Sequence, residues 1–158
     1  MNKALSKLLL HLLNVFLLLF LASDAGCQII QVDAGQTNFT CNSSASLENA
    51  QVSVNAFSIS VYSPSTFSVY AKVQNVSSSS GVLMPASMLA MKLNTVSPSR
   101  SANYNTFTLG TNNQQIIQST NTGSRYVTYS YNLIAGPVGY NYPPGSQLFN
   151  MLFTLTNP

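Results

Sequence analysis

The chain contains few of the side chains on which most enzymes and nucleic-acid-binding proteins depend. Its 158 residues include one histidine, no tryptophan, three acidic residues and six basic ones. The N-terminus holds Lys3 and Lys7, then an apolar run over residues 8–22 that contains the histidine, then small residues. This order predicts a signal peptide, residues 1–25, and a single mature domain, residues 26–158. A run of about fifteen apolar residues is shorter than a membrane-spanning helix, so no transmembrane anchor is expected after cleavage.

The mature chain has no histidine, and its charges are few and scattered. Two acidic residues against four basic ones leave a net charge of +2; they are Asp33, Glu48, Lys72, Lys92, Arg100 and Arg125. Without histidine, acid–base catalysis and most zinc or iron sites lose their usual group, so we expect no enzyme, no metal and no cofactor. A hydrolase with Asp33 and Glu48 as its carboxylates is the alternative to a turn aspartate and a solvated glutamate. Four separated basic residues are too few to bind a nucleic acid.

Two cysteines, Cys27 and Cys41, remain after the signal peptide. An even number of cysteines in an exported chain predicts a disulfide, which would stabilise the fold by about 3 kcal/mol. Lipidation of Cys27 is the alternative, because the sequence from Asp24 to Cys27 resembles a lipobox. Two points oppose it: Asp24 stands where a lipobox has an aliphatic residue, and lipidation would leave Cys41 unpaired.

Alternation of apolar and polar residues predicts an all-β fold. The clearest strand is residues 67–73, and residues 57–61 alternate in the same way. The residues 63–65 between them read as a tight turn, so the two strands are predicted to form a hairpin. Residues 52–54 are out of phase with residues 57–61, which predicts a β-bulge near Asn55 or Ala56.

The remaining strands are expected at shorter alternating runs separated by turn residues. They are residues 27–33, 37–41, 89–93, 107–109, 116–117, 127–133 and 149–155. About eight or nine short strands without a helix predict an antiparallel immunoglobulin-like β-sandwich. In that fold the disulfide would join the first strand to its neighbour.

Tyrosines are the residues best suited to binding. Tyr129 and Tyr131 lie in a predicted strand and are expected in the core, whereas Tyr126, Tyr140 and Tyr142 flank it. An exposed tyrosine can stack on a sugar ring or anchor a protein partner, because its ring is apolar and its hydroxyl is polar. The last three are therefore candidate ligand-stacking residues; the alternative is that Tyr140 and Tyr142 only brace their loop.

The layout of the mature chain resembles bacterial exported β-sandwich proteins, the pilin-like and spore coat U-like domains. The features that carry the resemblance are the early Cys27, the alternating residues 51–73, the run 85–93, and the turn 142–145 followed by residues 149–156. The resemblance implies a structural or adhesive surface subunit without enzymatic activity. With the predicted signal peptide, we expect the protein to be secreted, periplasmic or at the cell surface. The expected partners are further copies of the chain, other surface subunits or, through the tyrosines, glycans.

One feature departs from the pilin pattern. Pilins polymerise by donating an extended N-terminal strand to the neighbouring subunit, a form of strand addition. Here Cys27 follows the predicted cleavage site almost at once. We therefore expect no strand donation from that end.

Overall fold

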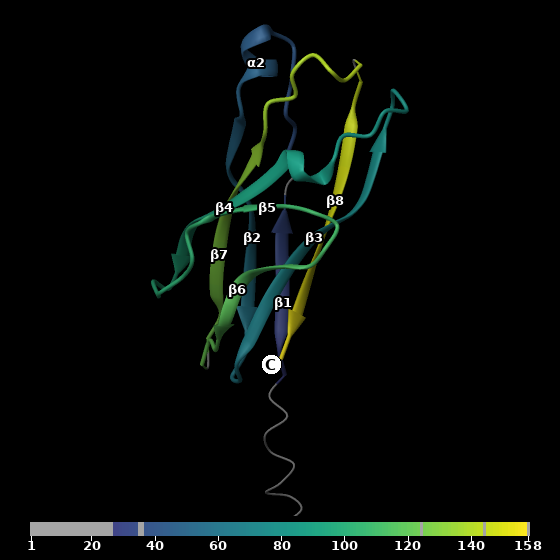
Figure 1. Ribbon diagram of the computed structural model, residues 1–158. Coiled ribbons are helices and arrows are strands. Elements are labelled where there is room, and N and C mark those ends of the chain that lie inside the picture. Colours follow the sequence, from purple (N-terminus) through teal and green to yellow (C-terminus); the bar gives the residue numbers. More distant parts are fainter. Residues whose placement is uncertain (1–26, 35–36, 124, 144, 158) are drawn as a thin grey trace, which may run out of the picture.

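Strands dominate the structure (Figure 1). The computed structural model describes residues 27–34, 37–123, 125–143 and 145–157, and the predicted signal peptide lies outside them. The strands are β1 (Ile29–Ala34), β2 (Gln51–Tyr62), β3 (Phe67–Ser78), β4 (Leu89–Ser97), β5 (Thr106–Thr108), β6 (Gln114–Thr120), β7 (Val127–Ala135) and β8 (Gln147–Thr156). The helices are α2 (Ser44–Glu48) and the 3-10 helix η1 (Ala86–Met88). Within these described residues, no helix is long and apolar enough to cross a membrane.

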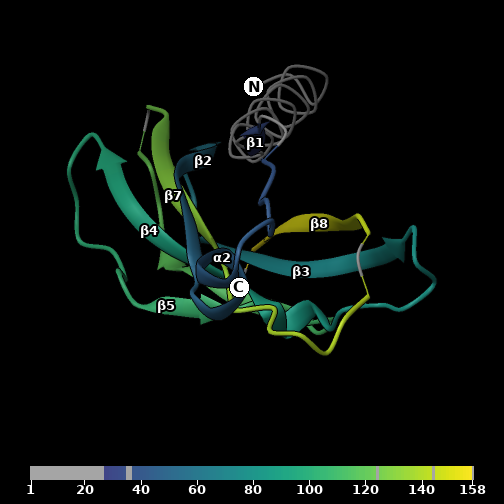
Figure 2. The ribbon, with the colours of Figure 1, turned by 90° about the horizontal axis from the view of Figure 1, so that it is seen from above.

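The strands form two antiparallel sheets. One sheet has the order β1-β2-β7-β4-β5 and the other the order β6-β3-β8. Seen from above, the sheets lie on either side of the core, and the edge strands β1 and β8 lie on the same side of the molecule (Figure 2). The prediction of an all-β antiparallel sandwich is confirmed, and the eight strands among the described residues agree with the expected number.

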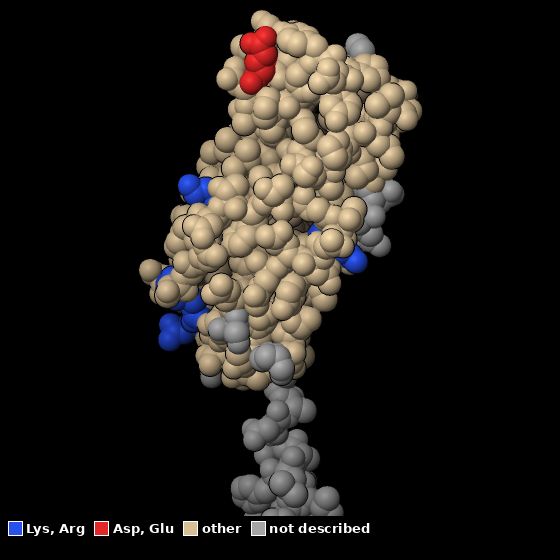
Figure 3. All heavy atoms as spheres, viewed as in Figure 1, with Lys and Arg blue, Asp and Glu red and all other residues tan. Residues whose placement is uncertain are grey.

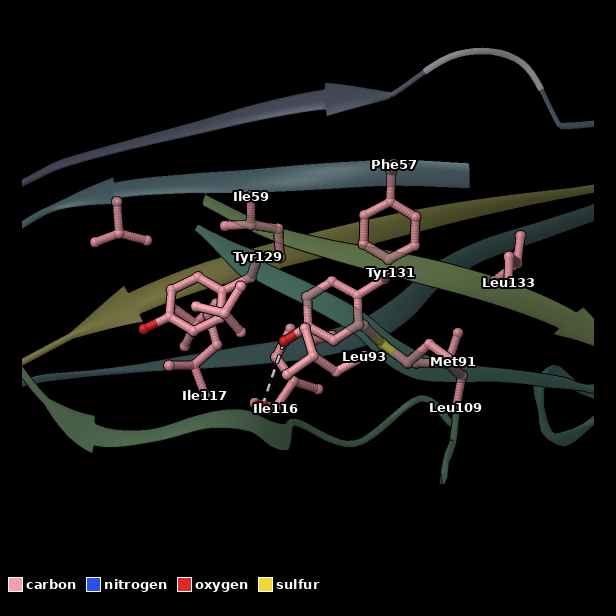
Figure 4. Close-up of a cluster of buried hydrophobic side chains, with 14 of the residues drawn as sticks. Phe57, Ile59, Met91, Leu93, Leu109, Ile116, Ile117, Tyr129, Tyr131 and Leu133 are labelled. Carbon is pink, nitrogen blue, oxygen red and sulfur yellow. Dashed lines mark hydrogen bonds between the residues drawn. The ribbon is translucent and has the colours of Figure 1, made fainter. Parts of the chain in front are cut away.

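The core is built from the inward-facing residues of both sheets (Figure 4). Phe57 stacks on Tyr131 of the neighbouring strand, with 5.4 Å between ring centroids and 13° between planes, and also meets Phe153 of the opposite sheet at 5.4 Å. Full burial of one large apolar side chain contributes about 1.5–3 kcal/mol to the free energy of unfolding. The largest fully buried apolar side chains are Ile59, Val61, Phe67, Val69, Val73, Met91, Leu109, Val127, Tyr129 and Tyr131. The prediction that Tyr129 and Tyr131 are core residues is thus confirmed.

The predicted hairpin between residues 57–61 and 67–73 is wrong. β2 pairs with β1 and β7, while β3 pairs with β6 and β8 in the other sheet. The intervening turn carries the chain across the core, and both strands still turn their alternating apolar residues inward. Alternation predicts which face of a strand is buried; it does not say which strand lies beside it.

The predicted bulge is confirmed. The register between β2 and β7 shifts between Ser53 and Phe57, and Asn55 adopts a left-handed φ of 51°. The Asn55 amide donates to Asn132 Oδ1 at 3.0 Å, and Asn94 Nδ2 donates to Asn55 Oδ1 at 2.8 Å. Side-chain hydrogen bonds to the adjacent β7 and to β4, one strand further across the sheet, therefore hold the irregular backbone in place.

The segment between β1 and β2 differs from prediction. Asp33 is not in a turn: it belongs to β1 and pairs with Ser58. Residues 37–41, predicted as a strand, are irregular, and the five-residue α2 follows them. Ser43 and Ser46 form a capping box at its start, in which each side chain bonds the other's backbone. Five residues are too few for a helical apolar period, so this pair is the only local signal for α2.

Candidate functional site

Cys27 and Cys41 are both free and exposed, so the predicted disulfide is wrong. Cys41 lies at one end of β2, where Gln51 Nε2 donates to its Sγ at 3.4 Å. Cys27 lies at the other end, two residues before Ile29, which pairs with Tyr62. Twelve residues of strand span more than about 30 Å. A disulfide needs Cα atoms within about 7 Å, so the two thiols of one chain cannot meet in this fold.

The three candidate tyrosines do not form one platform. Tyr126 immediately precedes β7, whereas Tyr140 and Tyr142 follow it, so the length of a nine-residue strand separates them, about 30 Å. Tyr140 is 67% exposed and Tyr126 is 50% exposed, while Tyr142 is half-buried. Tyr126 and Tyr140 are thus the exposed rings of the three candidates, and they lie at opposite ends of β7.

Tyr140 braces its loop against α2. Its hydroxyl donates to Glu48 Oε1 at 2.9 Å, and the neighbouring Gly139 amide donates to Leu47 O at 2.8 Å. The hydrogen bond to the Glu48 carboxylate, with a smaller contribution from burial, raises the pKa of Tyr140. Because its hydroxyl is already engaged, this geometry supports the alternative of a loop-bracing residue.

At the other end of the sandwich, Tyr126 forms part of an aromatic surface that the sequence did not reveal. Its ring lies 5.5 Å from the ring of Tyr62, tilted by 46°. Ile29, which is exposed, pairs with Tyr62 across β1 and β2, and directly opposite residues project from the same face. We call Ile29, Tyr62 and Tyr126 the tyrosine row. The alternation of β2 predicts that Tyr62 faces away from the core. Its contact with Tyr126, however, depends on the pairing of β2 with β7, which the sequence did not reveal.

The two acidic residues lie apart. Asp33 pairs with Ser58, seven residues along β2 from Gln51, whereas α2 with Glu48 lies beyond Gln51 at the far end of the sandwich (Figure 1). Seven strand residues span about 23 Å, and glycosidase carboxylates lie within roughly 10 Å of each other. The structure therefore separates the two carboxylates of the hydrolase alternative.

Asp33 also borders an open hollow. The lining residues are Asp33, Ala34, Asn55, Ala56, Phe57, Ser58 and Ser130. Asp33 Oδ1 accepts a hydrogen bond from Gln31 Nε2 at 3.0 Å, and it is the one ionisable side chain in this lining. Within the described part of the chain, no three His, Cys, Asp or Glu residues gather closely enough to hold a metal ion.

The outer strand β8 exposes apolar side chains. Leu148 is 58% exposed and Leu152 is 37% exposed on its outward face. Its inward residues Phe149, Met151 and Phe153 pack on the core but remain partly exposed. In the described sheets β8 pairs with β3 alone, so its second edge has no strand beside it.

The surface that surrounds these features is nearly free of charge. On the face drawn in Figure 3, acidic atoms occur at the end where α2 lies, and basic side chains occur only at the left edge, at the lower left and at the right. Apolar edge strands and tyrosine rings on a neutral surface suit contact with proteins or glycans. Comparison of the chain with protein-family models, with curated proteins and with solved structures gives no match.

Proposed function

We propose that the protein is an exported, non-enzymatic, immunoglobulin-like β-sandwich that acts as a structural or adhesive subunit. The observation that carries the proposal is the unpaired edge of β8, with Leu148 and Leu152 exposed along it. An unpaired edge is a template for adding a strand from another chain, and soluble monomers usually protect such an edge. Here the edge carries neither charge nor proline.

The strand order supports the immunoglobulin-like part of the proposal. An immunoglobulin constant-type sandwich has strands A-B-E-D in one sheet and C-F-G in the other. The order β1-β2-β7-β4 corresponds to A-B-E-D, and the neighbours β3 and β8 correspond to C and F. In that comparison the seventh strand, G, would stand beside β8. The open edge is therefore where the related fold carries one more strand.

The test combines location with binding. Antibody labelling of intact producing cells and of the medium should detect the protein outside the membrane, and the purified mature chain should bind cells, other surface subunits or itself. Protein found only inside the cell, or an exported protein that binds none of these, would contradict the proposal. Asp33→Asn with Glu48→Gln serves as the control for catalysis and should leave binding unchanged.

A second candidate function, carbohydrate binding, is favoured by the tyrosine row. Tyr62 and Tyr126 present two adjacent rings, and the hydroxyls of Ser60 on β2 and Thr128 on β7, each two residues away from one of the tyrosines, lie 2.9 Å from each other. On a glycan array, Tyr126→Ala should abolish a signal that Tyr140→Ala, at the opposite end, leaves intact. Equal loss in both variants, or no signal from the wild type, would reject this function.

A further inference from the structure

Four strands form the outer edges of the two described sheets, and three of them are protected. β1 has six residues and carries Asp33, and β5 has only three residues. β6 meets β3 with two register shifts, which make that edge irregular. Charges, short length and irregularity are the usual defences against edge-to-edge pairing.

β8 has none of these defences. It is ten residues long, from Gln147 to Thr156, without a charged residue, glycine or proline. Its single register irregularity against β3 lies between Val73 and Asn75. The segment just before β4 adds to its apolar character, because Gln147 Nε2 donates to Val82 O at 2.7 Å and Val82 is exposed. A long, neutral and regular edge of this kind is suited to pairing with another strand.

The sequence of β8 fits a second copy of itself. When two identical strands pair antiparallel about Asn150, each Leu148 lies opposite Leu152 of the other copy, because residues at equal distances from the centre face each other. Phe149 then lies opposite Met151 on the inward side. Both exposed leucines are covered, apolar residues meet apolar residues on both faces, and no like charges are opposed.

We propose that β8 of one copy pairs antiparallel with β8 of a second copy across a two-fold axis at Asn150, which joins the two three-stranded sheets into one continuous sheet. This inference rests on the proposed function and names its partner as the protein itself. The contact uses the same patch on both copies, so it closes into a dimer. The dimer is the unit in which the protein would meet other surface partners.

Site-specific cross-linking tests the register. In a background with Cys27→Ser and Cys41→Ser, Asn150→Cys should form a disulfide-linked dimer under mild oxidation, because directly opposite Cβ atoms lie about 5 Å apart. Thr154→Cys on the same face is the matched control, since the two copies of that position would lie roughly 27 Å apart. Absence of the Asn150→Cys dimer, or equal cross-linking of Thr154→Cys, overturns the proposal.

A charge exchange at the same position tests association without cross-linking. Asn150→Lys places two like charges opposite each other and should weaken dimerisation more than about tenfold, as should Asn150→Glu. An equimolar mixture of the two variants should dimerise again, measured by light scattering after size-exclusion chromatography. Val54→Lys, an exposed apolar position on β2, is the control and should dimerise like the wild type.

The two proposals fail in different ways. If the wild type stays monomeric, or if the Asn150→Lys and Asn150→Glu mixture does not dimerise, the β8 pairing is wrong, while binding to cells or glycans would still support a surface subunit. If the protein dimerises through β8 but is found only inside the cell, the proposed function is wrong and the pairing stands. Circular dichroism of each variant confirms that the fold is intact.

Discussion

At the scale of single residues, Ser63 and Thr122 fix the point where the chain crosses between the sheets. Both are buried. The Ser63 amide donates to Thr122 Oγ1 at 2.7 Å, and the Thr122 amide and hydroxyl each donate to Ser63 O at 2.9 Å. Gln28 Nε2 completes the group by donating to Ser63 Oγ at 2.7 Å. These hydrogen bonds satisfy backbone groups that would otherwise be buried without partners.

Thr122→Val should lower the free energy of unfolding by about 1–3 kcal/mol. Valine keeps the shape of threonine but cannot accept the hydrogen bond of the buried Ser63 amide, and an unsatisfied buried donor is destabilising by that amount. Urea denaturation measures the change. Thr95→Val, an exposed position on β4, is the control and should change stability by less than about 0.5 kcal/mol. Equal effects in the two variants would contradict the role of Thr122.

Cys27 and Cys41 give a second prediction at this scale. Both thiols are exposed, so both should react with a thiol reagent without denaturant, and a reductant should not change the melting temperature. The Cys27→Ser, Cys41→Ser double variant should keep its stability within about 0.5 kcal/mol. Intact mass under non-reducing conditions checks the prediction: a chain lighter by two hydrogens contains a disulfide, and a heavier chain carries a lipid on Cys27.

At the scale of elements, the sequence predicted strands well and their neighbours poorly. The inward residues of β2, β3, β7 and β8 follow from alternation, since one face of each strand must be buried. The β2–β3 hairpin was wrong because a short turn between two strands fits a hairpin and a crossing between sheets equally well. The hydrogen bond from Ser63 to Thr122, residues that lie far apart in the sequence, holds the crossing in place and could not be read from the local sequence.

The β2 bulge offers a prediction about a whole element. Asn55 has a φ of 51°, a conformation that asparagine and glycine tolerate and β-branched residues do not. Asn55→Val should therefore destabilise the protein by about 1–2 kcal/mol. Asn55→Gly should retain more stability, because glycine accepts this φ even though it loses the hydrogen bond from Asn94. A chemical denaturation series ranks the variants, and Val54→Thr, with an ordinary backbone, is the control. A smaller loss for Asn55→Val than for Asn55→Gly would contradict the backbone argument.

At the scale of the whole molecule, the candidate binding surfaces depend on contacts that the sequence does not encode locally. Tyr62 and Tyr126 meet because β2 pairs with β7. The outer edge of β8 is open because β8 is the last strand of its sheet among the described residues. Composition did predict the neutral surface around them. The identity of exposed side chains was thus readable from the sequence, but their grouping required the sheet topology.

Two buried tyrosines connect the core to the pH dependence of the whole fold. Burial raises the pKa of Tyr131 above that of an exposed tyrosine, and the neighbouring Tyr129 adds to the rise. Burial also raises the pKa of Tyr129, although the nearby Arg100 guanidinium opposes part of it. Tyr129 Oη makes no hydrogen bond of good geometry, whereas Tyr131 Oη donates to Ile116 O at 3.4 Å (Figure 4). Both hydroxyls therefore stay protonated in the folded protein at a pH where exposed tyrosines ionise.

The fold should consequently lose stability in alkali. Below pH about 10, the pKa of an exposed tyrosine, folded and unfolded chains hold the same tyrosine protons, and the stabilisation is fully present. Above it the unfolded chain releases protons that the folded chain retains, so unfolding becomes progressively more favourable until the raised pKa values are reached. The urea concentration at the midpoint of unfolding should decrease as the pH is raised from about 9 to about 11. The decrease should be smaller in Tyr131→Phe, which keeps the ring stacked on Phe57. Tyr126→Phe keeps both buried hydroxyls and should follow the wild type; an unchanged slope in Tyr131→Phe would show that another group controls alkaline unfolding.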